Sequence, residues 1–187
     1  MVYAQVHLAL PAWIHEAVDP LTVCADDTSK LALAIELSRL NVRHETGGPF
    51  GAAVFDESSG RLIGVGVNRV LPLACSVAHA ETMAYMTAQA RTQKVRLNED
   101  GTRIVLATSS QPCCMCYGAT FWAGIDTLLI GARSEDVMAL TDFDEGPLPA
   151  DWIGELGKRG IGVRRDLLRE RACAVLGEYG RSEHRRY

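Results

Sequence analysis

Two short motifs in this chain carry side chains that bind metal ions. The first is His79-Ala80-Glu81, and the second, further along the chain, places Cys113 and Cys116 directly after a proline. One imidazole and two thiolates are strong ligands for Zn²⁺, and catalytic zinc sites typically use three protein ligands and keep one position for water. We therefore expect His79, Cys113 and Cys116 to hold a Zn²⁺ ion with one open position.

Glu81 stands two residues after the histidine, beside the expected ion. Zinc lowers the pKa of a bound water, so that a nucleophilic hydroxide forms near pH 7. A neighbouring carboxylate can take the proton of that water, pass it to a ring nitrogen and then help to protonate the departing amine. The motif predicts hydrolytic removal of an exocyclic amino group from an electron-poor heterocycle, with Glu81 as the proton shuttle.

Neither motif taken alone is specific to a catalytic site. His-x-Glu occurs by chance, and Cys-x-x-Cys is also typical of redox sites and of structural zinc sites. Three of the six cysteines lie within residues 113–116, however, and this crowding favours a metal site over a disulfide framework. The two motifs in this order favour the catalytic interpretation.

Hydrophobic periodicity and turn residues predict alternating strands and helices around these motifs. Strands are expected at residues 50–55, 62–67, 103–108, 127–131 and 160–163, and helices at residues 28–43, 79–91, 113–123 and 166–179. Strands that alternate with helices indicate a layered α/β fold. With 187 residues, 48% of them apolar, the chain can bury one sizeable core, and we expect a single domain over residues 1–187.

Both motifs are expected where a strand leads into the start of a helix, with Pro112 at a first helical position. The positive end of a helix dipole stabilises nearby thiolates, which makes a metal easier to hold. The spacing of Cys113 and Cys116 puts both sulfurs on one side of the first turn. Cys114 points elsewhere, and we expect it to pack rather than to bind metal.

The charge balance argues against a surface that grips nucleic acid. The net charge is −4, from 19 basic and 23 acidic side chains. Basic residues concentrate in residues 151–187, where a solvated helix with a charged tail is expected rather than contact with nucleic acid. Because no apolar stretch is long enough for a membrane span and no secretory signal is recognisable, we expect a cytoplasmic protein.

Around these motifs the chain resembles the cytidine deaminase-like superfamily. The resemblance covers roughly residues 28–133 and includes Gly-Pro-Phe-Gly-Ala-Ala-Val-Phe, the residue Asn68, His79-Ala80-Glu81 and Ser-Gln-Pro-Cys-Cys-Met-Cys. It is most similar to the bacterial nucleobase branch that contains guanine deaminases, including members that accept the triazine ammeline. The segment Asp-Phe-Asp-Glu-Gly-Pro at 142–147 points to this branch. The resemblance implies a three-layer α/β/α fold with a five-stranded mixed sheet.

The resemblance also implies polar contacts to a substrate. Glu145 is similar to an acidic residue that reaches the substrate as a second carboxylate, although a solvated loop acid is the alternative. Such a carboxylate suits an aminopurine, which carries N–H donors and needs protons moved at more than one ring position. Asn68 resembles an asparagine that forms a hydrogen bond with the ring, and a turn asparagine is its alternative. Ala80, between the histidine and the glutamate, is assigned to substrate binding.

Aromatic side chains could stack on a flat base. The candidates are Phe50, Trp122 and Phe143, of which we favour Phe50 and Phe143, and each could equally belong to the core.

The leading hypothesis is a zinc-dependent deaminase that converts guanine to xanthine and ammonia. Cytosine, cytidine or another nucleoside, an aminotriazine and another aminopurine stay open as substrates, because pocket shape rather than the motif decides among them. An RNA adenosine deaminase is disfavoured by the acidic excess of residues 1–150, and a noncatalytic zinc domain by the presence of Glu81. The resemblance further implies a homodimer that exchanges a C-terminal segment, about residues 150–187, with the tail 183–187 as a lid over the partner's site.

Overall fold

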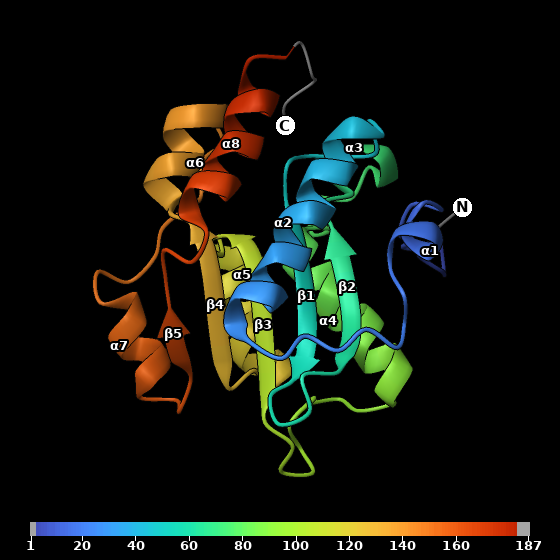
Figure 1. Ribbon diagram of the computed structural model, residues 1–187, viewed down its shortest axis with the longest axis vertical. Coiled ribbons are helices and arrows are strands. Elements are labelled where there is room, and N and C mark those ends of the chain that lie inside the picture. Colours follow the sequence, from blue (N-terminus) through green and yellow to red (C-terminus); the bar gives the residue numbers. More distant parts are fainter. Residues whose placement is uncertain (1–2, 183–187) are drawn as a thin grey trace.

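Five strands form one mixed sheet in the computed structural model, which describes residues 3–182 (Figure 1). The strands are β1 (Gly51–Asp56), β2 (Leu62–Val67), β3 (Ile104–Ser110), β4 (Thr127–Ala132) and β5 (Gly162–Arg164). Their order across the sheet is β2-β1-β3-β4-β5. β1 runs antiparallel to β2 and to β3, whereas β3, β4 and β5 are parallel. The predicted five-stranded mixed sheet is confirmed.

Helices cover both faces of the sheet (Figure 1). They are α1 (Ile14–Ala17), α2 (Asp27–Arg43), α3 (Val70–Leu73), α4 (Ala80–Thr92), α5 (Cys114–Ala123), α6 (Ser134–Thr141), α7 (Trp152–Gly157) and α8 (Arg169–Gly180). α2 and α8 pack on one face, with α6 against α8, while α4 and α5 lie behind the sheet in the view of Figure 1. The arrangement is the predicted three-layer α/β/α fold.

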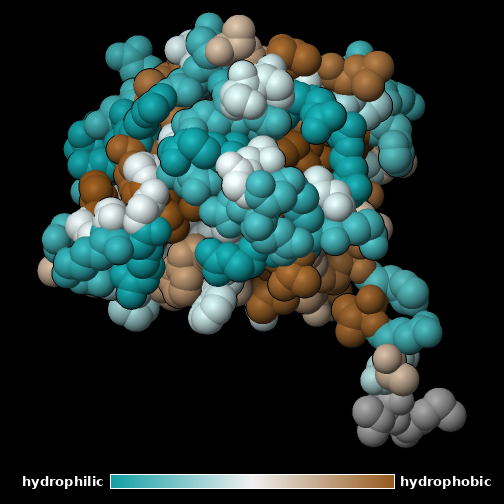
Figure 2. Space-filling view, turned by 90° about the horizontal axis from the view of Figure 1, so that it is seen from below, coloured by the Kyte–Doolittle hydropathy of each residue, from teal (hydrophilic) through white to brown (hydrophobic). Residues whose placement is uncertain are grey.

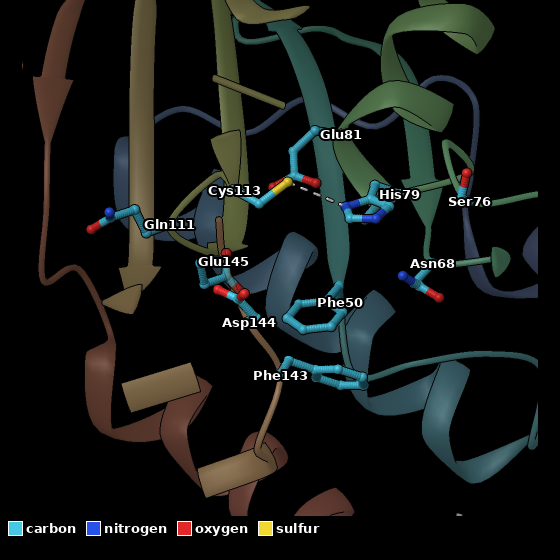
Figure 3. A pocket seen from close by; sticks show the side chains of 11 residues that line it. Phe50, Asn68, Ser76, His79, Glu81, Gln111, Cys113, Phe143, Asp144 and Glu145 are labelled. Atoms are coloured by element: carbon cyan, nitrogen blue, oxygen red, sulfur yellow. Dashed lines mark hydrogen bonds between the residues drawn. The ribbon is translucent and has the colours of Figure 1, made fainter. Parts of the chain in front are cut away.

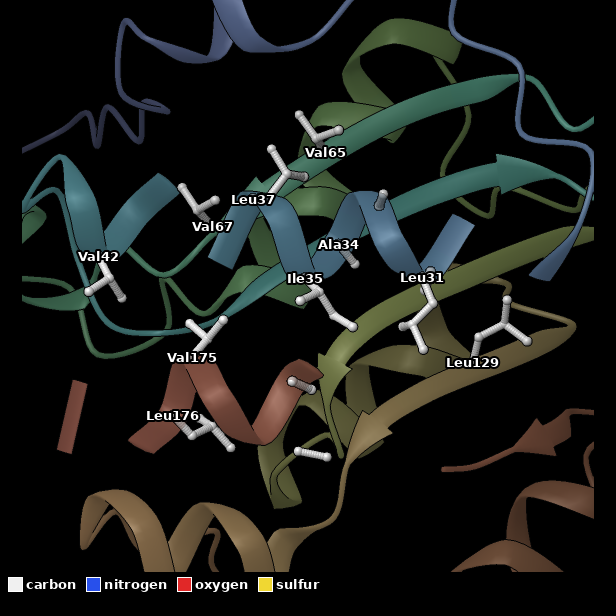
Figure 4. Close-up of a cluster of buried hydrophobic side chains, with 14 of the residues drawn as sticks. Leu31, Ala34, Ile35, Leu37, Val42, Val65, Val67, Leu129, Val175 and Leu176 are labelled. Atoms are coloured by element: carbon white, nitrogen blue, oxygen red, sulfur yellow. The ribbon is translucent and has the colours of Figure 1, made fainter. Parts of the chain in front are cut away.

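Alternating side chains of the central strands build a core on each face of the sheet. Ala53 and Phe55 of β1 join Leu31 and Leu37 of α2 in one buried cluster, part of which is drawn in Figure 4. The intervening residues of β1, such as Val54, join a second cluster on the other face, with α4 and α7. Because both faces are buried, the central strands are apolar throughout rather than alternating with polar residues.

Glycine in β2 lets the helix that carries Glu81 lie close to the sheet. A Cβ atom at Gly66 would lie 2.0 Å from the backbone oxygen of Ala80 and 2.3 Å from the backbone nitrogen of Ala84. Any larger residue would therefore push the first turn of α4 away from β2. This close packing holds the His79-Ala80-Glu81 motif in place against the edge strand β2.

The structure corrects the predicted bounds on either side of both motifs. Ser109 and Ser110, expected in a loop, belong to β3, since β3 pairs with β4 as far as Ser110 and Ala132. Pro112 precedes the N-cap residue Cys113 and is not the first helical residue. The short helix α3, rather than a strand, precedes His79. Each motif nevertheless lies at the N-terminus of a helix, as predicted.

Four short helices were not expected from the sequence. α1, α3, α6 and α7 have four to eight residues each, too few turns for a clear hydrophobic period. The last strand and the last helix also begin later than predicted, at Gly162 and Arg169. The late start of α8 follows from its N-cap residue, Leu168, which adopts a left-handed backbone conformation with φ 49° and so separates the helix from the residues before it.

The C-terminal segment packs on the sheet of its own chain. β5 pairs with β4, and α8 contacts both β4 and α2. Exchange of residues 150–187 between subunits stays a prediction, as does the assignment of residues 1–187 to one domain. The proposed lid at 183–187 lies outside the described residues.

None of the helices in the described part of the chain, residues 3–182, combines the length and the apolar composition that crossing a membrane requires. Hydrophilic residues predominate on the face of the molecule shown in Figure 2, and hydrophobic residues form smaller groups between them.

An ion pair ties α6 to α8. Arg169 donates two hydrogen bonds of 2.7 Å to the carboxylate of Asp136, which also accepts a 2.9 Å bond from the backbone N–H of Arg133. These bonds, chiefly those from Arg169, lower the pKa of Asp136 from 3.8 to about 2. Asp136 is therefore charged in the folded state over nearly the whole pH range in which the protein is handled.

We expect Asp136→Asn to lower the free energy of unfolding by about 1.5 kcal/mol at pH 7, the lower end of what hydrogen bonds to a charged group contribute, because the pair is only partly buried. Because the folded-state pKa is depressed, the wild-type advantage is complete above pH 3.8 and disappears as the pH falls through about 2. Urea unfolding followed by circular dichroism across this range measures both effects. Glu155→Gln, which breaks the exposed pair with Lys158, is the control and should change stability much less. Equal effects of the two substitutions would contradict the stabilising role of the ion pair between Asp136 and Arg169.

Candidate active site

Three metal-binding side chains converge at the N-termini of α4 and α5. His79 is the N-cap residue of α4, Cys113 is the N-cap residue of α5, and Cys116 lies in the first turn of α5. Their ligand atoms all lie within 4.8 Å of one another, and the Cys113 sulfur lies 3.5 Å from Nδ1 of His79. Two sulfurs and one imidazole nitrogen are a donor set that fits zinc. The three residues predicted from the sequence could thus hold one ion together.

The electrostatics of this cluster favour a thiolate. Hydrogen bonding from the Cys116 thiol, with a further contribution from His79, lowers the pKa of Cys113 well below its ordinary value. Burial lowers the pKa of His79, but the hydrogen bond to Cys113 and the charge of Glu81 outweigh it, so the net pKa is raised. The cluster therefore gathers negative charge that a divalent cation would neutralise.

Glu81 is buried beside this cluster. It lies in the first turn of α4, is 6% exposed, and accepts a 3.1 Å hydrogen bond from the hydroxyl of Thr108 in β3. Burial raises its pKa, and the negative charge of Cys113 raises it further. A buried carboxyl with a raised pKa is suited to giving and taking protons.

A cavity of about 280 Å³ opens beside the metal-binding cluster (Figure 3). All six residues predicted for catalysis and substrate binding line it, namely Phe50, Asn68, Ala80, Glu81, Phe143 and Glu145. His79 and Cys113 line it as well, whereas Cys116 is fully buried. The structure thus brings all nine predicted residues to one place, and their individual roles stay predictions.

Glu145 reaches the cavity because its loop is bound to the start of α5. Its backbone oxygen accepts a 3.0 Å hydrogen bond from the N–H of Cys114, the first residue of α5. A 2.9 Å bond from the N–H of Gly146 to the carboxylate of Asp144 stabilises the turn that follows. Burial raises the pKa of Glu145 to about 8, and the charges of Cys113 and Glu81 add to this effect. The alternative of a solvated loop acid does not fit a side chain that is 9% exposed.

Two aromatic rings form one wall of the cavity. The ring centroids of Phe50 and Phe143 lie 5.6 Å apart, and Phe143 also stacks on Tyr179 of α8. Trp122, the aromatic candidate that we did not favour, is 69% exposed on α5 and is not among the residues that line the cavity. Cys114 is exposed, lies outside the group of metal-binding side chains, and has its sulfur next to Gly146.

Asn68 follows β2 and is almost fully buried, with 1% exposure. Its side-chain oxygen accepts hydrogen bonds of 3.3 Å from the backbone N–H groups of Gly48 and Val70. In Figure 3 its side-chain nitrogen is turned toward the part of the cavity where His79 and Phe50 lie. The amide can therefore present a donor to a ring bound there.

Three further residues line the cavity and were not predicted to do so, Ser76, Gln111 and Asp144. Gln111 directly precedes the Pro-Cys-x-x-Cys motif and Asp144 directly precedes Glu145, so their positions next to assigned residues could have identified them. Ser76 lies between α3 and α4, and because α3 was not predicted, no signal in the sequence placed Ser76 near the site.

Comparisons with known proteins agree with this geometry. A model of the cytidine and deoxycytidylate deaminase zinc-binding region matches residues 25–132. The solved structure of guanine deaminase from Nitrosomonas europaea is 44% identical, with a TM-score of 0.90 over 96% of this chain and 98% of that chain. A solved complex with 2,6-diaminopurine is also 44% identical, with a TM-score of 0.91 over 97% and 95% of the two chains. The probable cytosine deaminase of Schizosaccharomyces pombe is 35% identical over 127 residues, 68% of this chain and 72% of that protein.

We expect the purified protein to bind one zinc ion per chain, and Cys116→Ala to lose it. Removing a direct ligand should weaken zinc binding by more than the roughly 10- to 100-fold that loss of an outer partner costs. Metal content by mass spectrometry and competition with a chelator give the two measurements. Cys114→Ala is the matched control, since Cys114 is two residues away and outside the cluster. Equal zinc affinity in the two variants would rule out the proposed ligand set.

Proposed function

Since the chain belongs to the family of the cytidine and deoxycytidylate deaminase zinc-binding region, we propose that this zinc-dependent deaminase converts guanine to xanthine and ammonia. The observation that carries the choice of guanine is Glu145, a buried second carboxyl in the same cavity as Glu81 and the metal-binding cluster. The 44% identity to a guanine deaminase over nearly the whole chain supports the same choice.

His79, Cys113 and Cys116 would hold the zinc ion. When bound, zinc supplies a Lewis acid that ionises water near neutral pH. Glu81 takes the proton of the attacking water and delivers it to the ring nitrogen next to the attacked carbon. It then takes the remaining proton from the hydroxyl added to that carbon and transfers it to the amino group, so that the carbon–nitrogen bond breaks, a C=O bond forms and ammonia leaves. The Thr108 hydroxyl, 3.1 Å from Glu81, keeps the carboxyl turned toward the reacting atoms.

Glu145 would recognise the N–H groups of the purine and exchange a proton at a second ring position. Its raised pKa, about 8, lies near neutrality, where a carboxyl can both donate and accept. Asn68 would bind a polar edge of the ring, while Phe50 and Phe143 contact its flat face. The cavity of about 280 Å³ is at the small end of ligand pockets, which favours a free base over a nucleic acid strand.

Deamination of cytosine is the second candidate, and the likeness to a probable cytosine deaminase favours it. The two candidates share the zinc cluster and Glu81, so neither of these separates them. Glu145 does, because its proposed role is to bind the N–H donors of an aminopurine and to move a proton at a second ring position. A cytoplasmic location and a homodimer with an exchanged segment, about residues 150–187, stay predictions.

We expect Glu81→Gln to keep its zinc and to lower kcat by about 10²- to 10⁴-fold, the usual contribution of a general acid–base group. Glutamine preserves the size of the side chain and its hydrogen bond with Thr108 but cannot shuttle protons. Ammonia release from guanine, together with zinc content, measures the two effects separately. Wild-type turnover in a zinc-loaded variant would exclude Glu81 as the shuttle.

We expect the wild-type protein to prefer guanine in an ammonia-release assay over guanine, ammeline, cytosine, cytidine, adenine and adenosine. Glu145→Gln should lower kcat/KM for guanine by about 10²-fold or more, since one proton transfer and one charged contact are lost together. Glu135→Gln, an exposed residue of α6 outside the cavity, is the charge-matched control and should retain activity. A preference for cytosine, unaffected by Glu145→Gln, would favour the second candidate instead.

A further inference from the structure

Asn41 is fully buried in α2 and uses its whole carboxamide in hydrogen bonds to other segments. Its side-chain nitrogen donates to the backbone oxygens of Gly48, at 2.8 Å, and of Asn68, at 2.9 Å. Its side-chain oxygen accepts a 2.8 Å bond from the hydroxyl of Thr46. An amide carries two N–H donors on one nitrogen, and here each donor has its own carbonyl partner. Asn41 does not line the cavity.

The bonds from Asn41 restrain the backbone of Gly48 and of Asn68, and both help to place the Asn68 side chain. Gly48 donates its N–H to the side-chain oxygen of Asn68 while its own carbonyl is bound by Asn41. The backbone N–H of Asn68 donates to the oxygen of Phe50, at 3.1 Å, and its carbonyl is bound by Asn41. Asn41 therefore helps to fix the backbone of Asn68 directly and its side chain through Gly48. Val70 and Phe50 supply further hydrogen bonds.

The chain packs closely around these hydrogen bonds. A Cβ atom at Gly47 would lie 1.8 Å from the carbonyl oxygen of Asn68, so only glycine fits beside it. On the far side, the indole N–H of Trp13 donates a 2.9 Å bond to the hydroxyl of Thr46, which in turn donates to Asn41. A chain of hydrogen bonds thus runs from the N-terminal segment through Thr46 and Asn41 to the wall of the cavity.

We propose that Asn41 is a positioning residue for substrate binding, which sets the place and orientation of Asn68 in the cavity through the carbonyls of Gly48 and Asn68. The proposal rests on the proposed function, in which Asn68 binds the ring of the base. Loss of the two donors would remove the Asn41 hydrogen bonds from the carbonyl of Asn68 and from that of Gly48, which would keep its 2.8 Å bond from the Phe50 N–H. Because buried hydrogen bonds are lost, the segment that carries Asn68 would shift. A donor misplaced by about 1 Å binds the ring poorly, even though Asn68 itself is unchanged.

The test is a double-mutant cycle on guanine deamination with Asn41→Ala, Asn68→Ala and the double variant. We expect Asn41→Ala to raise KM about tenfold with kcat within about threefold, the pattern for lost ground-state binding. In the Asn68→Ala background the same change should alter KM less than twofold, because residues that act through one another are not additive. Ser38→Ala is the control. Ser38 is also fully buried in α2, but its hydroxyl bonds only to Ile35 of the same helix, so KM should not change.

A less destabilising pair of variants at Thr46 tests the proposal if Asn41→Ala does not fold. Thr46→Val keeps the shape of the side chain but removes the donor to Asn41, and should raise KM about threefold. Thr46→Ser keeps the hydroxyl and should restore the wild-type KM. An unchanged KM in Asn41→Ala, or in Thr46→Val where Asn41→Ala fails to fold, would overturn the proposal, as would an equal effect of Asn41→Ala with and without Asn68.

Failure of the proposed function gives a different result. If the wild-type protein does not deaminate guanine, the choice of substrate is wrong, and the same cycle is run on the base of the panel that it does deaminate. If the wild-type protein is active and the cycle shows no coupling, only the positioning role of Asn41 is wrong.

Discussion

Burial of several acidic groups in one cavity is the constraint on which the rest of this structure depends. Cys113, Glu81 and Glu145 face the same small space, and the charge of each raises the cost of ionising the others. Two helix N-termini offset part of this cost, because their free N–H groups and dipoles favour negative charge. A divalent cation offsets the remainder, so that metal binding and acid–base chemistry use the same electrostatics.

The fold meets this constraint by bringing the ends of distant segments together. α4 approaches the sheet closely at Gly66, near the end of β2, and α5 follows the end of the central strand β3. Both helices therefore start at the same end of the strands. The loop after α6 adds Glu145, while the residues before β1 and after β2 add Phe50 and Asn68. Helix N-termini thus carry the metal-binding residues and Glu81, and loops carry the residues proposed to choose the base.

The sequence predicted the sheet, the long helices and the metal-binding motifs, because each has a local signal. The apolar runs of β1, β3 and β4 and the period of α2 are such signals, and the two motifs mark His79, Glu81, Cys113 and Cys116. Asn68 and Glu145 followed from a resemblance and had no local pattern of their own. What could not be predicted depends on tertiary contacts. Ser109 and Ser110 join β3 only because β4 pairs with them, and Asn41 becomes important only because the fold places Gly48 and Asn68 beside it.

The hydrogen bond from the Cys114 N–H to the Glu145 carbonyl connects the substrate loop to the residue that follows a metal ligand. If binding at one place shifts this bond, the free energy of binding at the other place changes, and thermodynamic linkage makes that effect reciprocal. An ion that steadied the start of α5 would then also steady the loop at residues 142–147, and a base that contacts this loop would strengthen retention of the ion. In a cell where free zinc is scarce, the supply of substrate would then help to decide how much of the enzyme stays metal-loaded.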